Sequence, residues 1–339
     1  MKNIFTAAIC AATIVGVAAA ADHMAPQTHD PVMARGEDGR YYLFSTGMGV
    51  AVKSTDDFRQ WRQEPPVFPQ APAWAVDSVN GYGGHTWAPD IIRANGMWHL
   101  YYSCSTFGKN GSAIGHAVTP TLDPADPSFG WTDLGAVVVS HRDADNWNAI
   151  DPNLIIGSDG RAWLTFGSFW DGIQLMELSA SDLHTPLSAP VTIARRRAPG
   201  GAVMAEYREE EGVEAGDNAI EAPFVFRYGD WYYLFVSHDY CCRGEMSTYK
   251  TVYGRSRNPY GPYLDREGRD MAIGGGTWLA GPDHENYGVG HCSVYLVDGK
   301  PTFLAHAYVR AKGGESHLLM RELSFDADGW IVPAEANAE

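Results

Sequence analysis

The chain repeats one pattern of apolar and polar positions five times. Each copy holds a short apolar run, a polar turn of two residues, and a second run rich in aromatic and aliphatic side chains. Asn-Gly and Asp-Gly between such runs are typical of β-hairpins, because both residues can adopt a positive φ angle. We therefore predict five β-hairpins, within residues 29–45, 88–103, 151–168, 221–237 and 291–306.

A polar residue leads each predicted hairpin. The five leading residues follow one another at intervals of 60, 61, 70 and 70 positions: Asp30, Asp90, Asp151, Glu221 and His291. Such regular spacing is typical of a radial repeat, and a propeller blade starts with its innermost strand. The pattern thus predicts an all-β propeller in which these five residues converge on the central axis.

The first 21 residues have the composition of a secretory signal peptide. Lys2 is followed by an apolar run over residues 4–20 that ends in alanines. The run is short for a membrane span, so an uncleaved anchor is the less favoured alternative. We predict a signal peptide over residues 1–21, a single domain over residues 22–339, and a secreted or periplasmic protein.

The predicted mature chain is acidic. Removing Lys2 from 25 basic residues leaves 24 against 41 acidic residues, a formal charge of −17. This charge repels phosphate backbones and anionic lipids, which argues against nucleic-acid and membrane partners. The chain also lacks the motifs of zinc proteases, serine hydrolases and phosphate-binding loops. We expect a neutral substrate, and we predict that the glutamate-rich segment 199–217 is a solvated loop without a catalytic role.

Several carboxylates gathered at one axis favour acid–base chemistry. Glycoside hydrolysis needs one carboxyl group to protonate the leaving oxygen and another to activate water or attack carbon. An aspartate before a proline at the start of a strand is also a common structural cap, and any one of these acids could have that role. Acidic residues at four of five positions fit packing alone poorly, because like charges at an axis destabilise one another.

The motifs around the leading residues resemble those of one enzyme family. The segments 28–31, 87–90, 149–153, 167–170, 218–223 and 290–291 look like the successive blade motifs of arabinanases of glycoside hydrolase family 43. The block 247–250, preceded by Cys241-Cys242, is also similar. The resemblance covers nearly all of the mature chain and departs at Val289 and His116. It implies a five-bladed β-propeller that hydrolyses α-1,5-linked L-arabinan with inversion.

The resemblance also implies roles for individual residues. Asp30 would be the general base that activates water, and Glu221 the general acid. Asp151 would orient Glu221 and raise its pKa. Either burial or a neighbouring negative charge favours the protonated form of a carboxyl group, and Asp151 would supply that charge. For Asp90 we favour a structural hydrogen-bonding role over a catalytic one.

Five further residues would bind the sugar chain. Trp87, Phe107 and Trp170 are candidates for stacking on sugar rings, and Asn153 and Ser168 resemble positions that hydrogen-bond arabinose. Phe107 lies in a segment whose glycine and asparagine mark an exposed loop. For each aromatic residue a place in the core is the alternative.

His291 would bind a metal, and calcium is the ion that the resemblance implies. Calcium prefers oxygen ligands, so the chemistry of the residue alone does not suggest it. Water completing the shell around one imidazole would reconcile the two. The alternative is an axial histidine that only forms hydrogen bonds.

Other functions remain open at this point. A different family 43 activity, α-L-arabinofuranosidase or β-xylosidase, would use the same acids in a blocked pocket. A non-catalytic carbohydrate-binding propeller would use the same aromatic residues but would not need an acid with a raised pKa. The favoured prediction is an endo-1,5-α-L-arabinanase that acts as a monomer on arabinan and arabino-oligosaccharides.

Overall fold

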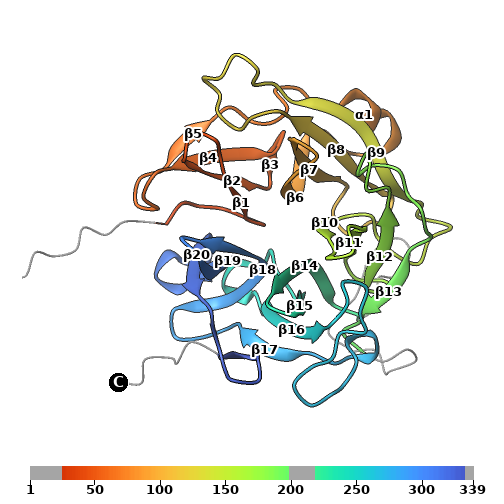
Figure 1. Ribbon diagram of the computed structural model, residues 1–339, viewed down its shortest axis with the longest axis vertical. Helices are drawn as coiled ribbons and strands as arrows, with labels where there is room; N and C mark the ends of the chain where they lie inside the picture. Colours follow the sequence, from red (N-terminus) through yellow and green to blue (C-terminus); the bar gives the residue numbers. More distant parts are fainter. Residues whose placement is uncertain (1–24, 198–217, 333–339) are drawn as a thin grey trace, which may run out of the picture.

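Five β-sheets surround a common centre in chain order (Figure 1). The computed structural model describes residues 25–197 and 218–332. It confirms the predicted all-β fold, a five-bladed β-propeller. The predicted signal peptide and the segment 199–217 lie outside these residues. In the described part of the chain, no helix is both long enough and apolar enough to cross a membrane.

Each blade is one antiparallel sheet whose strands follow one another from the axis outward. Blade 1 contains β1 (Val32–Arg35), β2 (Tyr41–Ser45), β4 (Ala51–Thr55) and β5 (Arg62–Glu64). Blade 2 contains β6 (His85–Ala94), β7 (Met97–Cys104), β8 (Ser112–Thr119) and β9 (Thr132–Ser140), with β3 (Gly47–Met48) at the edge of β6. A short helix α1 (Ala73–Ser78) lies between these blades in the sequence.

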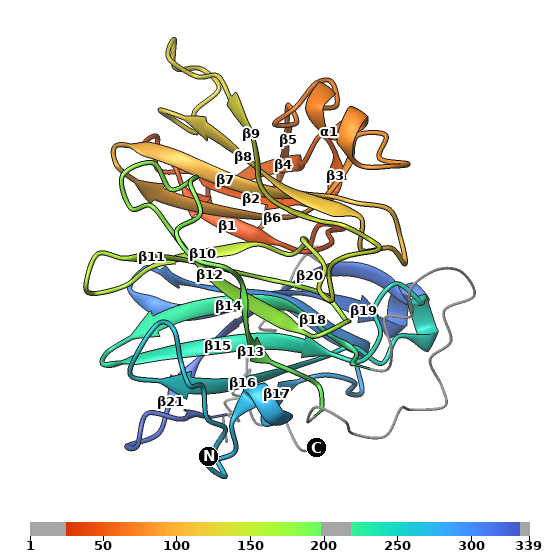
Figure 2. The ribbon, with the colours of Figure 1, turned by 90° about the vertical axis from the view of Figure 1, so that its right-hand side faces the viewer.

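The other three blades repeat this plan. Blade 3 contains β10 (Asn153–Ile156), β11 (Ala162–Phe166), β12 (Ile173–Leu178) and β13 (Val191–Ala194). Blade 4 contains β14 (Ile220–Tyr228), β15 (Trp231–His238), β16 (Lys250–Ser256) and β17 (Thr277–Ala280). Blade 5 contains β18 (Asn286–Val297), β19 (Lys300–Val309) and β20 (Glu315–Glu322). In the side view of Figure 2, blades 2 and 4 lie above and below the strands of blade 3.

The five predicted hairpins are the two innermost strands of the five blades. In blades 2, 4 and 5 the turn has two residues, as predicted; in blade 2, for example, Ala94 pairs with Met97 around Asn95-Gly96. In blades 1 and 3 the ladder ends earlier, at the pairs Arg35–Tyr41 and Ile156–Ala162. The predicted turns there are part of longer connections.

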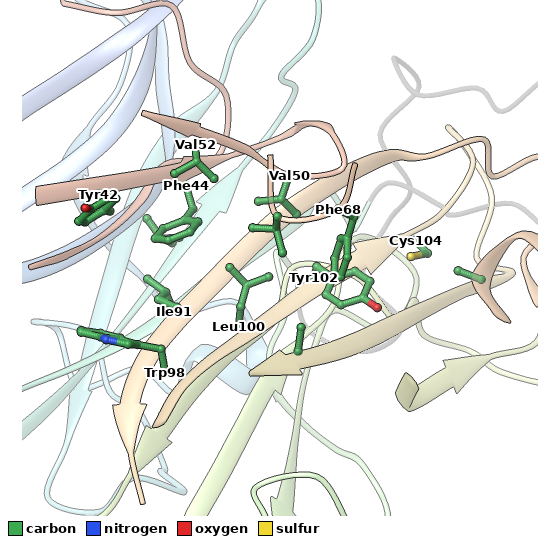
Figure 3. Close-up of a cluster of buried hydrophobic side chains, with 14 of the residues drawn as sticks. Tyr42, Phe44, Val50, Val52, Phe68, Ile91, Trp98, Leu100, Tyr102 and Cys104 are labelled. Carbon is green, nitrogen blue, oxygen red and sulfur yellow. The ribbon is translucent and has the colours of Figure 1, made fainter. Parts of the chain in front are cut away.

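The apolar core lies between neighbouring blades. Between blades 1 and 2, Phe44 and Val52 on one sheet face Ile91, Leu100 and Tyr102 on the next (Figure 3). Each blade packs against a neighbouring blade on either face, so its strands bury side chains on both faces of the sheet. Burying one large apolar side chain stabilises the fold by about 1.5–3 kcal/mol. Most tyrosines belong to this core rather than to a binding surface.

The segment before β1 closes the ring. Gln27 forms an isolated bridge with His317 on β20, and the N–H of Thr28 donates to the carbonyl of Ser316 at 3.3 Å. The chain then enters β1, which is the inner strand of blade 1 and lies next to β18 (Figure 1). The first and last blades therefore meet directly beside Asp30. After β20 the chain ends its described part in the hairpin β21 (Ser324–Phe325) and β22 (Ile331–Val332).

Candidate active site

A residue with left-handed backbone geometry precedes the inner strand in blades 1 and 3, and in blades 2, 4 and 5 it lies within the inner strand where the ladder is interrupted. Five non-glycine residues occupy this position, with φ angles of 56°, 40°, 58°, 57° and 46°: Asp30, Ala88, Asp151, Ala222 and His291. All but His291 are followed by proline. A positive φ is unfavourable for side chains with a Cβ, and such strained residues concentrate at functional sites. This kink is the position that the five repeats share.

The kink corrects the predicted alignment of the repeats. Asp30, Asp151 and His291 occupy equivalent positions, but Glu221 stands one residue before the kink and Asp90 two residues after it. The prediction of acidic residues at four of five equivalent positions was therefore wrong. The hydrophobic pattern that locates a hairpin cannot specify where its first strand is kinked.

Side chains from other positions in the ring hold these kinks. Each left-handed residue donates its backbone N–H to a side chain: Asp30 to His306 Nδ1 (3.1 Å), Ala88 to Thr46 Oγ1 (2.9 Å), Asp151 to Ser103 Oγ (3.0 Å), Ala222 to Asp151 Oδ2 (3.1 Å) and His291 to Ser237 Oγ (2.8 Å). Buried N–H groups need acceptors, and these bonds supply them where the ladder is interrupted. In four of the five cases the acceptor lies at or near the end of the second strand of the preceding blade.

A cavity of about 890 Å³ lies at this end of the axis and contains the candidate acids. Asp30, Asp151, Glu221 and His291 all line it, although up to 261 positions separate them in the chain. Four of the five predicted sugar-binding residues line it as well: Trp87, Phe107, Ser168 and Trp170. Phe107 is 77% exposed, which excludes the alternative of a core role for this residue.

Asn153 does not line the cavity, contrary to the prediction that it binds arabinose. It is buried, its Nδ2 donates to Asp90 Oδ1 at 3.2 Å, and its Oδ1 accepts the N–H of Val225 at 2.8 Å. Asp90 Oδ2 in turn accepts the N–H of Leu154 at 2.7 Å. Asn153 and Asp90 thus connect blades 2, 3 and 4, which gives Asp90 the structural role that we favoured.

Asp30 is held by donors on both carboxylate oxygens. His29 Nδ1 and His291 Nδ1 each lie 3.0 Å from Oδ1, and Thr46 Oγ1 donates to Oδ2. Burial alone would raise the pKa of Asp30. The positive charges of His291 and His29 outweigh burial and hold this pKa well below its usual range. Asp30 is therefore an ionised carboxylate at neutral pH.

The pKa values of Glu221 and Asp151 shift in the opposite direction, upward. Burial raises the pKa of Glu221, and the nearby thiolate of Cys242 raises it further. Burial and the charge of Glu221 raise the pKa of Asp151 to about 8. The prediction named burial or a neighbouring negative charge as the cause of a raised pKa at Glu221, with Asp151 as the source of that charge. In the structure burial is the main cause of the raised pKa of Glu221, and the charge of Cys242 comes next.

Two hydroxyl groups orient Glu221. Ser168 Oγ donates to Oε2 and Tyr249 Oη donates to Oε1, both at 2.8 Å. Tyr249 is buried, and its ring lies where a side chain at position 290 would begin: a Cβ on Gly290 would lie 2.3 Å from Tyr249 Cδ1. This close approach explains the glycine before His291.

The donors near His291 do not fit a calcium ion held by the protein alone. Among the described residues, the group with three ligand atoms close together is His29, Asp30 and His306. His306 Nδ1 already accepts the N–H of Asp30, and Asp30 is the only oxygen ligand in the group. Calcium usually takes six to eight oxygen ligands. Calcium at His291 thus stays a prediction that needs water for most of its shell.

Sequence reasoning missed several residues that contact the acids. They are His29, Thr46, Tyr249 and His306, and the free cysteines Cys241 and Cys242 also line or adjoin the cavity. His29 and Tyr249 lie inside motifs that carried the family resemblance, so a motif position was their available signal. Nothing local marked His306, whose partner lies 276 positions away.

Comparison with known families agrees with this geometry. The model of glycosyl hydrolases family 43 matches residues 24–331. The chain belongs to this family. It is therefore a glycoside hydrolase.

Two curated relatives are named for opposite modes of action. The chain is 43% identical over 302 residues to the extracellular exo-α-(1→5)-L-arabinofuranosidase ArbA of Cellvibrio japonicus, covering 89% of this chain and 85% of that protein. It is 38% identical over 306 residues to the extracellular endo-α-(1→5)-L-arabinanase 1 of Bacillus subtilis, covering 89% and 86%.

Solved structures share the fold along almost the whole chain. An exo-1,5-α-L-arabinanase from a bovine ruminal metagenomic library has a TM-score of 0.84 and 53% identity, covering 92% of this chain and 98% of that one. The α-L-arabinanase of Cellvibrio cellulosa in complex with arabinohexaose has a TM-score of 0.83 and 42% identity, covering 91% and 95%.

Proposed function

We propose that this enzyme hydrolyses α-1,5-linked L-arabinan by a single displacement that inverts the anomeric centre. One observation carries the proposal: Asp30 and Glu221 line the same cavity, and their surroundings shift their pKa values in opposite directions. An ionised carboxylate beside a carboxyl group that stays protonated is the pair that glycoside hydrolysis requires.

In the proposed reaction Glu221 is the general acid and Asp30 the general base. Glu221 donates its proton to the glycosidic oxygen as the bond to the anomeric carbon breaks. Asp30 accepts a proton from the water whose oxygen bonds to that carbon from the opposite face. Asp151 Oδ2 accepts the N–H of Ala222, the residue after Glu221, and so fixes the backbone that carries the acid. Burial keeps Glu221 protonated.

The cavity suits a neutral sugar chain. Trp87, Phe107 and Trp170 present aromatic side chains at its wall, and aromatic rings pack well against the apolar faces of sugars. The acidic balance of the chain disfavours anionic substrates. The names of the relatives supply the specific polymer, since exo- and endo-acting proteins among them are named for α-1,5-L-arabinan or its arabinose units.

On the mode of attack, internal cleavage was the prediction from sequence, and the endo-arabinanase of Bacillus subtilis supports it. Exo attack is the second candidate. It is favoured by the higher identities to the exo-acting proteins, 53% and 43% against 38%. We also propose that the enzyme is secreted or periplasmic, since these two relatives are named as extracellular. That it acts as a monomer stays a prediction.

Early products from linear arabinan test both the proposed substrate and the proposed mode of attack. Chromatography of samples taken before about a tenth of the bonds are cleaved should show a ladder of oligosaccharides if the enzyme cleaves internally. A single short product from the start would establish exo attack. Failure to cleave arabinan, together with hydrolysis of an aryl α-L-arabinofuranoside or of xylobiose, would overturn the proposed substrate.

A further inference from the structure

Where blade 5 closes the ring against blade 1, two of its residues lie next to Asp30, the proposed general base. His306 and Tyr308 both lie on β19, in blade 5, and both are buried. His306 Nδ1 accepts the N–H of Asp30, and the hydroxyl of Tyr308 lies 2.8 Å from His29 Nε2. Neither residue lines the cavity, so neither is placed to contact substrate.

The hydroxyl of Tyr308 controls the direction of the hydrogen bonds at His29. The N–H of Cys242 donates to this hydroxyl oxygen at 2.7 Å, which leaves the hydroxyl proton available for His29 Nε2. When His29 carries one proton, that proton then resides on Nδ1, which faces Asp30. When His29 carries two protons, Nε2 donates to the tyrosine oxygen and Nδ1 still donates to Asp30. In both forms the bond between His29 and Asp30 is kept.

The same contacts decide which part of Asp30 can accept a proton from water. A carboxylate offers about four acceptor positions. His29 and His291 use Oδ1, and Thr46 uses one position on Oδ2. The remaining position is on Oδ2. If His29 lost its orientation, Oδ1 would regain an open position and the carboxylate could rotate.

We propose that Tyr308 and His29 are positioning residues that hold the Oδ2 atom of Asp30 toward the attacking water. The general base is then assembled only when blade 5 closes against blade 1. This inference rests on the role of general base proposed for Asp30. It requires no contact between Tyr308 and the sugar chain.

The decisive variant is Tyr308→Phe in the full-length protein. It removes the hydroxyl and keeps the ring that packs edge-on against His306 at a centroid distance of 5.2 Å. We expect kcat on arabino-oligosaccharides to fall about 10- to 100-fold, by analogy with the range known for partners that orient metal-binding histidines. KM should stay within about twofold, because the substrate contacts are intact.

Tyr42→Phe is the matched control. Tyr42 is a buried tyrosine of blade 1 whose hydroxyl donates to Asp38 Oδ2 at 2.9 Å, away from the cavity. It should lose stability as Tyr308→Phe does, but its kcat should not change. Equal losses of kcat in both variants would show a general effect of destabilisation and overturn the inference.

Variants of His29 test the same inference without Tyr308. In His29→Asn the amide nitrogen can replace Nδ1 as the donor to Asp30, whereas in His29→Gln it comes closer to the position of Nε2. We expect kcat to decrease from the wild type to His29→Asn and further to His29→Gln. The kcat of His29→Ala should be no higher than that of His29→Gln. An Asn variant no better than Gln and Ala would contradict the positioning role, even if Tyr308→Phe failed to fold.

Asp30→Ala separates the proposed general-base role of Asp30 from the proposed positioning role of Tyr308 and His29. If Asp30→Ala stays active, the proposed function of Asp30 fails and the inference fails with it. If Asp30→Ala is inactive while Tyr308→Phe and the His29 variants keep the kcat of the wild type, only the inference is overturned.

Discussion

Tyr249→Phe should shift the alkaline limb of the activity profile to higher pH. Tyr249 Oη donates to Glu221 Oε1 at 2.8 Å, and this bond stabilises the ionised form of Glu221 and lowers its pKa. The substitution removes the donor and keeps the ring, which stacks near His306 at a centroid distance of 5.6 Å and covers Gly290. The substitution thus removes one donor from Glu221, together with the contact of the same hydroxyl with Ser237.

The size of the shift follows from the strength of one hydrogen bond to a charged group. Such a bond contributes about 1.5–3 kcal/mol. Since one pKa unit corresponds to about 1.4 kcal/mol, losing it raises the pKa of Glu221 by roughly one to two units. A general acid is active below its pKa, so the enzyme should retain activity at correspondingly higher pH.

The assay is kcat/KM for an arabino-oligosaccharide measured across the pH range in which the protein stays folded. The profile of kcat/KM reports the ionisations of the free enzyme. Ser168→Ala removes the other hydroxyl donor to Glu221 and should shift the same limb in the same direction. Tyr253→Phe is the control, because the hydroxyl of this buried tyrosine contacts the backbone of Ile331 instead.

An alkaline limb that stays in place or moves to lower pH in Tyr249→Phe would refute the assignment of Glu221 as the acid. A shift confined to the acidic limb would assign Glu221 to the base instead. The same shift in Tyr253→Phe would show that the profile follows stability rather than the ionisation of Glu221.

Four further outcomes are expected. Asp30→Ala should lower turnover by about 10²–10⁴-fold while thermal melting stays cooperative; near wild-type activity would remove Asp30 as the base. Phe107→Ala should raise KM with little change in melting temperature, because the side chain is 77% exposed; a large loss of stability would contradict this. Proton NMR in the first minutes of hydrolysis should show the β-anomer, and initial α-anomer would exclude single displacement. Metal analysis after dialysis in calcium buffer should show about one equivalent that His291→Ala loses, and absence of metal would leave His291 as a partner of Asp30.

The five hairpins and the propeller were determined by local sequence. Alternating apolar runs and positive-φ turns such as Asn95-Gly96 encode a hairpin within about fifteen residues, whatever the rest of the chain does. Regular repetition of that unit then leaves few ways to bury both faces of every sheet. The family motifs added Asp30, Asp151 and Glu221, which the structure brings into one cavity.

Only the tertiary structure decided which neighbours these residues have. Asn153 belongs to the same motif as Asp151, yet the kink turns it toward Asp90 and away from the cavity. His306 reaches Asp30 because the last blade closes on the first, across 276 positions of sequence. Hydrophobic patterning specifies which segments form buried strands, but the partner of a polar side chain depends on how neighbouring blades pack. The pKa values of the acids depend on that packing too, since burial and partners from other blades are their causes.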